Sequence, residues 1–406
     1  MTTFFRVVRV AEAVEGFRPG RRTRVETVAL AAAVGRVPVC AVAAPHALPG
    51  FTRSSLDGYA VRASDTFGCS EASPVYLSLV GAVQMGSAAD VTVGPGQAVA
   101  IPTGGALPEG ADAIAMVEHA SEALDRTVEV TAPVAPGYGV VRADEDVAAG
   151  AVCLRAGRAV SAHDVALLAA LGVTELDVFA RPRVAILSTG DEVVPPSTAS
   201  LAAGQVRDAT ADALAALVRE AGGEPRLNGI VRDNPGALTE ALRAAHAESD
   251  VILVSAGSSV GARDTTAEAI AALGAPGIWC HGLALKPGKP TILAECAGVP
   301  VIGLPGNPYS ALIVFRLVGA GVVRLIGGVT ESPPVSNAVA TLLDAVPSVA
   351  GRRDIVPVTL EADGARPLLG RSSQLSLLAC ADGLIQIPEE AGGLDAGTQV
   401  TVERLR

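Results

Sequence analysis

Several apolar stretches in the second half of the chain run into loops rich in serine, glycine and acidic residues. The stretch VSAGSSVGARDTT (254–266) follows an apolar run and carries Asp264 near its end. Small residues let backbone N–H groups approach a ligand closely, and successive N–H groups form a cradle for anions. An acidic side chain beside that cradle would repel phosphate unless a metal ion lay between them. The stretch therefore indicates a site for a phosphate-bearing ligand and a divalent cation.

Four further loops have a similar character. LSTGDE (187–192), GQVRDAT (204–210), VRDNP (231–235) and GLPGNPYS (303–310) place polar or glycine-rich residues after expected strands, and LKPGKPT (285–291) adds two lysines. In an open parallel sheet, ligands bind beyond the carboxyl ends of the strands, where such loops converge. We therefore predict substrate-binding roles for Ser188, Thr189, Gly190, Asp208, Ser255, Gly257, Ser259, Gly261, Lys286, Lys289, Pro305, Gly306, Asn307 and Ser310.

Three acidic residues of these loops, Glu192, Asp233 and Asp264, are the predicted metal ligands. Mg²⁺ takes oxygen ligands from one or two carboxylates together with substrate phosphate, so it would resolve the conflict between acids and phosphate. A structural alternative stays open for the acids, because each of four could act as a helix cap: Asp191, Asp208, Asp233 and Asp264. Lys286 and Lys289 could likewise belong to a solvated turn.

The elements that must position these loops alternate along residues 181–328. Strands are expected at 183–190, 225–233 and 250–257, and helices at 209–223, 235–249 and 264–274. A further strand, turn and helix are expected over 299–320. Alternating units of this length predict a three-layer α/β domain, in which helices cover both faces of a mostly parallel sheet.

The residues outside this α/β domain are expected to form three smaller domains. The whole chain is therefore predicted to be a multidomain α/β protein. Residues 1–46 and 143–180 are expected to form one elongated linker domain, with helices at 10–17 and 28–34. Short alternating runs between Gly and Pro predict that 47–142 is an inserted β-rich module. Residues 329–406 are expected to form a small β-barrel-like domain.

Composition excludes several classes of protein. A formal net charge of −11 argues against nucleic acid or an anionic membrane as the main partner. The six cysteines lack a C-x-x-C pair, which argues against zinc ribbons and a disulfide framework. The uncharged window 297–315 contains three prolines and cannot run as one spanning helix. We therefore expect a soluble, cytoplasmic protein. Dinucleotide-binding, P-loop and nucleophile-elbow motifs are absent as well.

Taken together, these motifs resemble those of the molybdopterin molybdotransferases, the family that includes the E domain of gephyrin. The resemblance covers essentially the whole chain. Its markers are RSSLDGYAVR (53–62), IPTGGALPEGADAIAMVE (101–118), DEDV (144–147), LSTGDEVV (187–194), SVGARD (259–264), LKPGKPT (285–291) and GLPGNPYSAL (303–312).

The resemblance implies an enzyme of molybdenum cofactor biosynthesis. It implies that molybdate is inserted into adenylylated molybdopterin, with release of AMP and with Mg²⁺ as cofactor. It also implies a homodimer in which Asp57, Thr103 and Asp146 complete the site, so the predicted catalytic set is Asp57, Thr103, Asp146, Glu192, Asp233 and Asp264. A molybdopterin adenylyltransferase is a further expected partner.

Two other functions are compatible with the same pattern. One is a non-catalytic scaffold that binds a partner peptide, as gephyrin does, although a scaffold has no need of five acids around one cleft. The other is a transferase that adenylylates molybdopterin, which the extra domains disfavour. Tungstate is an alternative to molybdate. Two stretches also depart from the usual family pattern. In VRDAT (206–210), Arg207, Ala209 and Thr210 replace larger polar contacts, and in SAGSS (255–259), Ala256 replaces a glycine.

Overall fold

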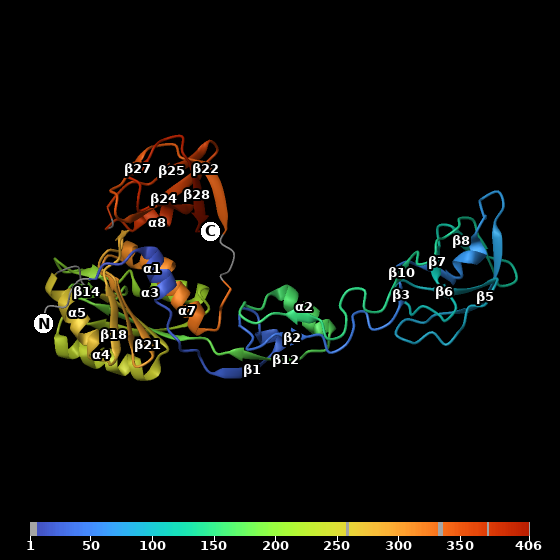
Figure 1. Ribbon diagram of the computed structural model, residues 1–406, viewed down its shortest axis with the longest axis horizontal. Coiled ribbons are helices and arrows are strands. Elements are labelled where there is room, and N and C mark those ends of the chain that lie inside the picture. Colours follow the sequence, from blue (N-terminus) through green and yellow to red (C-terminus); the bar gives the residue numbers. More distant parts are fainter. Residues whose placement is uncertain (1–5, 257–259, 332–335, 372, 406) are drawn as a thin grey trace. The chain divides into compact units, whose positions relative to one another are not determined.

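The chain folds into two compact units. The computed structural model describes residues 6–256, 260–331, 336–371 and 373–405, without the side chains of 235, 256 and 260–264. The first unit comprises residues 1–40, 156–161 and 175–406, and the second comprises 41–155 and 162–174 (Figure 1). The multidomain α/β class is confirmed, while the division into four domains at the limits given above stays a prediction.

A six-stranded sheet forms the centre of the first unit. Its order is β16-β13-β17-β21-β20-β18. The first four strands of that order are parallel and the last two are antiparallel to their neighbours. The bounds are β13 (Arg183–Thr189), β16 (Glu224–Val231), β17 (Val251–Ala256), β18 (Pro276–His281), β20 (Ile292–Cys296) and β21 (Val299–Pro305). The expected parallel core is present, and sequence reasoning missed β18 and β20.

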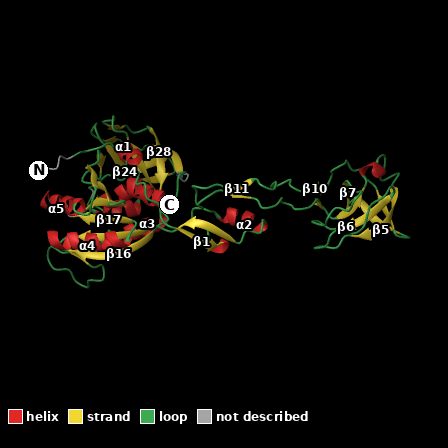
Figure 2. Ribbon diagram, turned by 60° about the horizontal axis from the view of Figure 1, so that its bottom comes forward, coloured by secondary structure: helices red, strands yellow, loops and turns green. Residues whose placement is uncertain are grey.

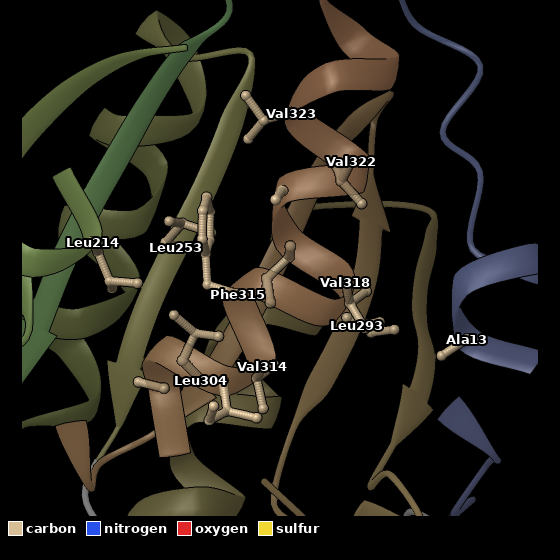
Figure 3. Close-up of a cluster of buried hydrophobic side chains, with 14 of the residues drawn as sticks. Ala13, Leu214, Leu253, Leu293, Leu304, Val314, Phe315, Val318, Val322 and Val323 are labelled. Carbon is tan, nitrogen blue, oxygen red and sulfur yellow. The ribbon is translucent and has the colours of Figure 1, made fainter. Parts of the chain in front are cut away.

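Helices cover both faces of this sheet because its strands are apolar on both sides. In β13, Val184 and Ile186 are buried on one face, while Ala185 and Leu187 are buried on the other. The first face packs against α1 (Val10–Gly16), α3 (Ala211–Glu220), α6 (Pro308–Val314) and α7 (Ala320–Ile326), and the second against α4 (Pro235–Glu248) and α5 (Val260–Ala271) (Figure 2). Figure 3 shows Phe315 beside Leu253 of β17 in the first of these cores.

One long helical run lies in that core. Within the described part of the chain, Pro308–Ile326 alone is long and apolar enough to cross a membrane by length and composition. Of its apolar 18-residue window, 67% is buried inside the molecule, as in a core helix. A π-helical turn, η3 (Phe315–Gly319), joins α6 to α7. The window 297–315 is interrupted as expected, since β21 ends at Pro305 before α6 begins.

Two expected helices differ from the structure. Residues 28–34 contain the end of strand β1 (Val25–Ala29) and the 3₁₀ turn η1 (Leu30–Ala32), because the branched residues of VETV pair with β12 (Glu175–Phe179). The helix expected from residue 264 begins at Val260, so Asp264 lies inside α5 and is not its cap. At residues 28–34, strand pairing with β12 outweighed the helix propensity of the sequence. At α5, the sequence pattern placed the start of the helix four residues too late.

A second sheet of the first unit includes a strand from the α/β region. Its order is β19-β24-β26-β28-β22, with β25 also paired to β24. The bounds are β19 (Leu285–Lys286), β22 (Asn337–Thr341), β24 (Arg353–Glu361), β25 (Gly364–Pro367), β26 (Gly383–Ile387) and β28 (Gln399–Arg404), with the pair β23 (Val346–Pro347) and β27 (Gly393–Leu394) and the helix α8 (Ser376–Cys380) nearby in sequence. Because β19 pairs with β24, the LKPGKPT loop is attached to the C-terminal sheet.

The second unit is β-rich over the predicted insertion. Its sheet has the order β7-β4-β6-β5-β9-β8. The strands are β4 (Gly58–Val61), β5 (Val75–Ala82), β6 (Gln97–Ile101), β7 (Ala113–Met116), β8 (Ala120–Ala123) and β9 (Thr127–Val130). The rest comprises η2 (Ala63–Thr66), α2 (Ala162–Ala170) and two short pairs, β2 (Val42–Ala43) with β11 (Val152–Leu154) and β3 (Arg53–Ser54) with β10 (Val140–Val141).

The buried carboxylate of Asp250 ties together the start of the main sheet. Its Oδ2 accepts from Arg183 N at 3.0 Å and Arg183 Nε at 3.1 Å, and its Oδ1 accepts from Arg21 Nη2 at 3.0 Å. Burial alone would raise the pKa of Asp250, but the hydrogen bonds and charge of Arg183 outweigh it, so the pKa lies below its usual value. The carboxylate is therefore a structural group outside the predicted site.

We expect Asp250→Ala to lower the free energy of unfolding by about 2 kcal/mol at pH 7, because the backbone N–H of Arg183 and two guanidinium groups lose a charged hydrogen-bond acceptor. Since the folded pKa is depressed, this stabilisation is present above the unfolded pKa of about 3.9 and is lost as the pH falls through the folded value. Urea denaturation of the variant, beside Asp363→Ala in an exposed turn, measures the effect. A loss below about 1 kcal/mol would contradict the structural role.

Candidate functional site

The carboxyl ends of four parallel strands meet at one edge of the main sheet. Ser188 of β13 is in register with Ser255 of β17, and Ser255 with Leu304 of β21. Thr189 is in register with Val231 at the end of β16. The loops that follow these strands therefore emerge at a common edge, as the parallel arrangement requires.

Three carboxylates gather at one end of this edge, and we call Asp191, Glu192 and Asp233 the acid corner. The backbone N of Asp233 donates to Asp191 Oδ1 at 3.4 Å. Burial, followed by the charges of Glu192 and Asp191, raises the pKa of Asp233 above its usual value. Gly190, at φ +140°, leaves room for Glu192, because a Cβ there would lie 2.7 Å from Glu192 Oε2. None of the three acids forms an ion pair within the described residues.

The acid corner suits a hard cation by its donor chemistry. Carboxylate oxygens without a basic partner carry excess negative charge, and Mg²⁺ is held by one or two such groups together with substrate phosphate. Within the described residues, no group of three His, Cys, Asp or Glu side chains is arranged to hold a metal ion. The third predicted ligand, Asp264, lies in α5, and its side chain is outside the described residues, as are Gly257 and Ser259.

Hydroxyl groups at the end of β13 have different surroundings. Ser188 is 2% exposed, and its Oγ has no hydrogen-bond partner within the described part of the chain. A buried hydroxyl without a partner is costly, so a ligand atom there would satisfy it. The hydroxyl of Thr189 instead donates to the carbonyl oxygen of Ser255 at 3.1 Å and links two adjacent strands.

The capping alternative is resolved for two of the acids. Asp208 Oδ1 accepts from the backbone N of Thr210 at 2.9 Å and of Ala211 at 3.1 Å, at the start of α3. At α4 the cap is Asn234, whose Oδ1 accepts from Gly236 N at 2.9 Å. Asp208 therefore has a structural use, whereas Asp233 is not needed as a cap.

We expect Asp208→Ala to lower the free energy of unfolding by about 1 kcal/mol, because two backbone N–H groups at the start of α3 lose their acceptor. Asp208→Ser should restore most of this loss, since a serine oxygen can accept the same bonds. Thermal unfolding of the two variants and the parent measures the difference. Equal stability of Asp208→Ala and the parent would show that the carboxylate does not stabilise the helix.

A large cavity lies between this edge of the sheet and the C-terminal sheet, within the first unit. Its volume is about 1080 Å³. It brings together six of the predicted substrate-binding residues, namely Lys286, Lys289, Pro305, Gly306, Asn307 and Ser310. Ser188, Thr189, Gly190, Asp208 and the acid corner do not line it. The structure thus divides the predicted site into a cavity and a separate group of acids on the same sheet edge.

The charged lining of the cavity is mostly basic. Lys286, Lys289, Arg352 and Arg371 line it together with one acid, Asp354. Lys286 Nζ lies 3.5 Å from Asp354 Oδ2, and Arg352 Nε lies 2.9 Å from Asp354 Oδ1. Asp354 is 3% exposed, so one buried carboxylate holds two cations at the wall. A cavity with three more positive than negative charges, in a chain of net charge −11, is suited to an anion.

Sequence reasoning missed Arg352, Asp354 and Arg371. Register places Lys286 opposite Asp354 when β19 pairs with β24, a contact between segments far apart in the chain. One signal was available in the sequence, because Lys286 and Lys289 are its only lysines and every other basic side chain, histidine aside, is arginine. A lysine is a compact, strongly hydrated point charge that arginine does not replace, so its restriction to this loop marks the loop.

Glycine at two cavity positions is required by close packing. Gly288 has φ +129°, and a Cβ there would lie 2.6 Å from Val314 Cγ2. A Cβ at Gly303 would lie 3.0 Å from Ile292 Cβ.

Arg207, which departs from the usual family pattern, donates to the carbonyl oxygen of Thr198 at 2.7 Å, so its side chain stabilises a loop.

The remaining predicted catalytic residues, Asp57, Thr103 and Asp146, are exposed in the second unit. Asp57 Oδ1 accepts from the backbone N of Thr103 at 2.8 Å, so two of the three lie together. The glycine after Asp57 is needed, because a Cβ at Gly58 would lie 2.1 Å from the carbonyl oxygen of Ala115. This close approach explains the D-G pair in the motif RSSLDGYAVR.

Comparisons with known proteins give matches over nearly the whole chain. Three family models match: the MoeA N-terminal region (domains I and II) at residues 8–172, a probable molybdopterin binding domain at 185–324, and the MoeA C-terminal region (domain IV) at 339–405. The chain is 35% identical over 400 residues to molybdopterin molybdenumtransferase 2 of Mycobacterium tuberculosis, covering 97% of this chain and 96% of the relative.

A second relative and a solved structure also match the chain. The molybdopterin molybdenumtransferase of Nostoc sp. is 38% identical over 309 residues, which cover 75% of this chain and 70% of the relative. The crystal structure of a molybdopterin biosynthesis MoeA protein from Pyrococcus horikoshii matches with a TM-score of 0.83 and 36% identity, covering 99% of this chain and 100% of that one.

Proposed function

The chain belongs to the MoeA family of molybdopterin molybdenumtransferases, and we propose that it inserts molybdate into adenylylated molybdopterin with Mg²⁺-dependent release of AMP. Membership makes it an enzyme of molybdenum cofactor biosynthesis. The adenylylated form of the substrate, the release of AMP and the metal requirement are the parts that we add.

The observation that supports this proposal most directly is a basic cavity and a group of acids at the same edge of the sheet. The reaction needs a place for an oxyanion and a place for a metal-bound phosphate, within reach of each other. Lys286, Lys289 and Arg352 supply positive charge in the cavity. The acids at the same sheet edge supply the negative charge that a cation requires. Neither feature alone would distinguish this chemistry from general anion binding.

In the proposed arrangement, molybdate binds in the basic cavity. Lys286 attracts the dianion and donates to an oxygen, while Asp354 keeps Lys286 and Arg352 at the wall. Charge-assisted hydrogen bonds of this kind are about twice as strong as neutral ones. Tungstate has nearly the same size and charge, so the same residues would accept it.

The pterin phosphates lie, in this proposal, along the sheet edge between the cavity and the acids. Backbone N–H groups of residues 304–307, at the end of β21, would hold these phosphates, and the Ser188 hydroxyl, which has no partner among the described residues, is available to a ligand oxygen. Glu192, Asp233 and Asp264 would hold Mg²⁺, which supplies Lewis-acid stabilisation of charge on the departing phosphate. Water cleaves the phosphoanhydride bond in this step, so that AMP leaves with one phosphate, the pterin keeps the other and the proton from water passes to solvent.

The homodimer, the roles of Asp57, Thr103 and Asp146 in completing the site, the adenylyltransferase partner and the cytoplasmic location remain parts of the proposal that rest on the family resemblance. The scaffold alternative is not favoured, because curated relatives named as transferases cover 97% and 75% of the chain.

The test is to incubate the purified protein with adenylylated molybdopterin, Mg²⁺ and molybdate and to measure AMP. We expect release that requires both molybdate and Mg²⁺, with tungstate as a parallel arm. Release without molybdate would indicate a simple hydrolase, and no release under any condition would contradict the proposed reaction. Asp264→Asn is expected to abolish release while the protein still folds.

A further inference from the structure

A second cavity lies at the opposite end of the main sheet. It is lined by Phe179–Pro182, which precede β13, by the residues that end α3, and by the end of α7. Its volume is about 640 Å³, within the range of small-molecule sites. The seven residues of β13 span roughly 20 Å, so this cavity is separate from the basic cavity and the acid corner at the other edge.

Arginine dominates the charged lining of this second cavity, which we call the arginine cavity. Two acids, Glu220 and Glu331, oppose five arginines. The arginines are Arg36, Arg158, Arg181, Arg219 and Arg324. Like charges gathered in one hollow repel each other, so a bound anion would stabilise the arrangement.

Ion pairs and hydrogen bonds within the protein neutralise only part of the positive charge of these arginines. Arg36 is buried, pairs with Glu26 and donates to the carbonyl oxygen of Phe179 at 2.8 Å. Arg181 and Arg219 form no ion pair or side-chain hydrogen bond with any described residue. Arg181 Nη2 lies over Gly35, 3.8 Å from the position of a Cβ there. Two guanidinium groups therefore remain available to a ligand at the rim.

Arg324 lies in the wall of the same cavity, at the end of α7. Burial, and then the charge of Arg316 outside this cavity, lowers the pKa of Arg324. Basic residues in the last turn of a helix are common because they interact favourably with the helix dipole. That effect explains Arg219 on α3 and Arg324 on α7, but it does not explain Arg181, which precedes a strand.

The walls between the arginines are apolar. Val37, Pro182 and Val323 are buried there, and Phe179 adds an aromatic side chain. A bare inorganic ion would leave this surface in water. A ligand that matches the whole cavity carries an anionic group for the guanidinium forks and an apolar or aromatic body for the walls.

We propose that the arginine cavity is a second ligand site, separate from the molybdate chemistry, that binds a small organic phosphate through Arg181, Arg219 and Arg324. Phosphate is the favoured anion because it offers three oxygens to several arginines at once, whereas a carboxylate offers two. The site belongs to one face of the first unit and needs no residue of the basic cavity.

The test uses phenyl phosphate, titrated by calorimetry into the full chain and into Lys286→Gln, in which the basic cavity is weakened. We expect binding with the same Kd in both proteins. The double variant Arg181→Ala, Arg219→Ala should bind at least about tenfold more weakly, since two charge-assisted contacts are lost. Both arginines are exposed, so thermal unfolding should show an intact fold. Arg243→Ala on α4, an exposed arginine outside the cavity, should bind like the parent.

Three results would overturn the proposal. One is the absence of binding in Lys286→Gln, which would place the only phosphate site at the basic cavity. Another is an equal loss of binding in Arg243→Ala and in the double variant, which would indicate a general charge effect. The third is benzoate binding as tightly as phenyl phosphate, which would reject phosphate as the preferred anion. AMP release by the double variant is expected to equal that of the parent, so the outcome is independent of the proposed reaction.

Discussion

Asp233→Asn is expected to lower molybdate-dependent AMP release at least about 100-fold, because it removes a ligand of the Mg²⁺ that, in the proposed reaction, stabilises charge in the transition state. The protein itself should be as stable as the parent or more stable. Burial and the charges of Glu192 and Asp191 raise the pKa of Asp233, so its ionised form is disfavoured in the folded state. Asparagine removes the repulsion and keeps the shape.

The pH dependence of stability gives this prediction a second readout. A raised folded pKa means that the contribution of Asp233 to stability is full below the unfolded pKa of about 3.9 and is lost as the pH rises through the folded value. The stability advantage of Asp233→Asn should therefore be present at pH 7 and disappear near pH 4. Denaturant unfolding at several pH values measures it.

A matched control for this experiment is Asp363→Asn, which changes an exposed aspartate in a turn of the C-terminal sheet. That variant should release AMP at the parental rate and show no pH-dependent gain in stability. If Asp233→Asn retained full turnover, the acid corner would have no role in the reaction. A functional acid that destabilises the fold is the expected pattern at an active site, where stability is exchanged for activity.

Lys286→Gln is expected to raise the KM for molybdate about 10- to 100-fold, because a hydrogen bond to a charged group contributes roughly 1.5–3 kcal/mol. The fold should be unaffected, since Asp354 keeps its contact with Arg352 at 2.9 Å. Steady-state AMP release at varied molybdate separates KM from kcat. The larger change is expected in KM if Lys286 mainly binds the oxyanion.

Lys286→Arg distinguishes charge from shape at the same position. Arginine keeps the positive charge but presents a planar fork in place of a point charge. We expect a KM between those of the parent and Lys286→Gln. Arg226→Gln is the control, because it removes one positive charge from the exposed strand β16 away from the cavity. An unchanged KM in Lys286→Gln would exclude Lys286 from molybdate binding.

Much of the main domain could be predicted because its signals are local. The apolar runs at β13, β17 and β21 and the glycine after α3 are readable within a few residues of each other. Parallel strands bring their carboxyl ends to one edge, so the proximity of the Glu192 and Asp233 loops also follows from the pattern. Errors arose where two local signals competed, as at residues 28–34, where alanine-rich sequence favoured a helix and pairing with β12 produced a strand.

The sequence by itself determined the α/β core, the order of its loops and the family, because periodicity, glycine turns and short motifs are properties of neighbouring residues. Only the tertiary structure decided that Asp354 and Arg352 stand beside Lys286 and that five arginines share a cavity at the far edge of the sheet. These contacts join segments distant along the chain. Their formation depends on which strands pair and how helices pack, and no local pattern encodes that choice.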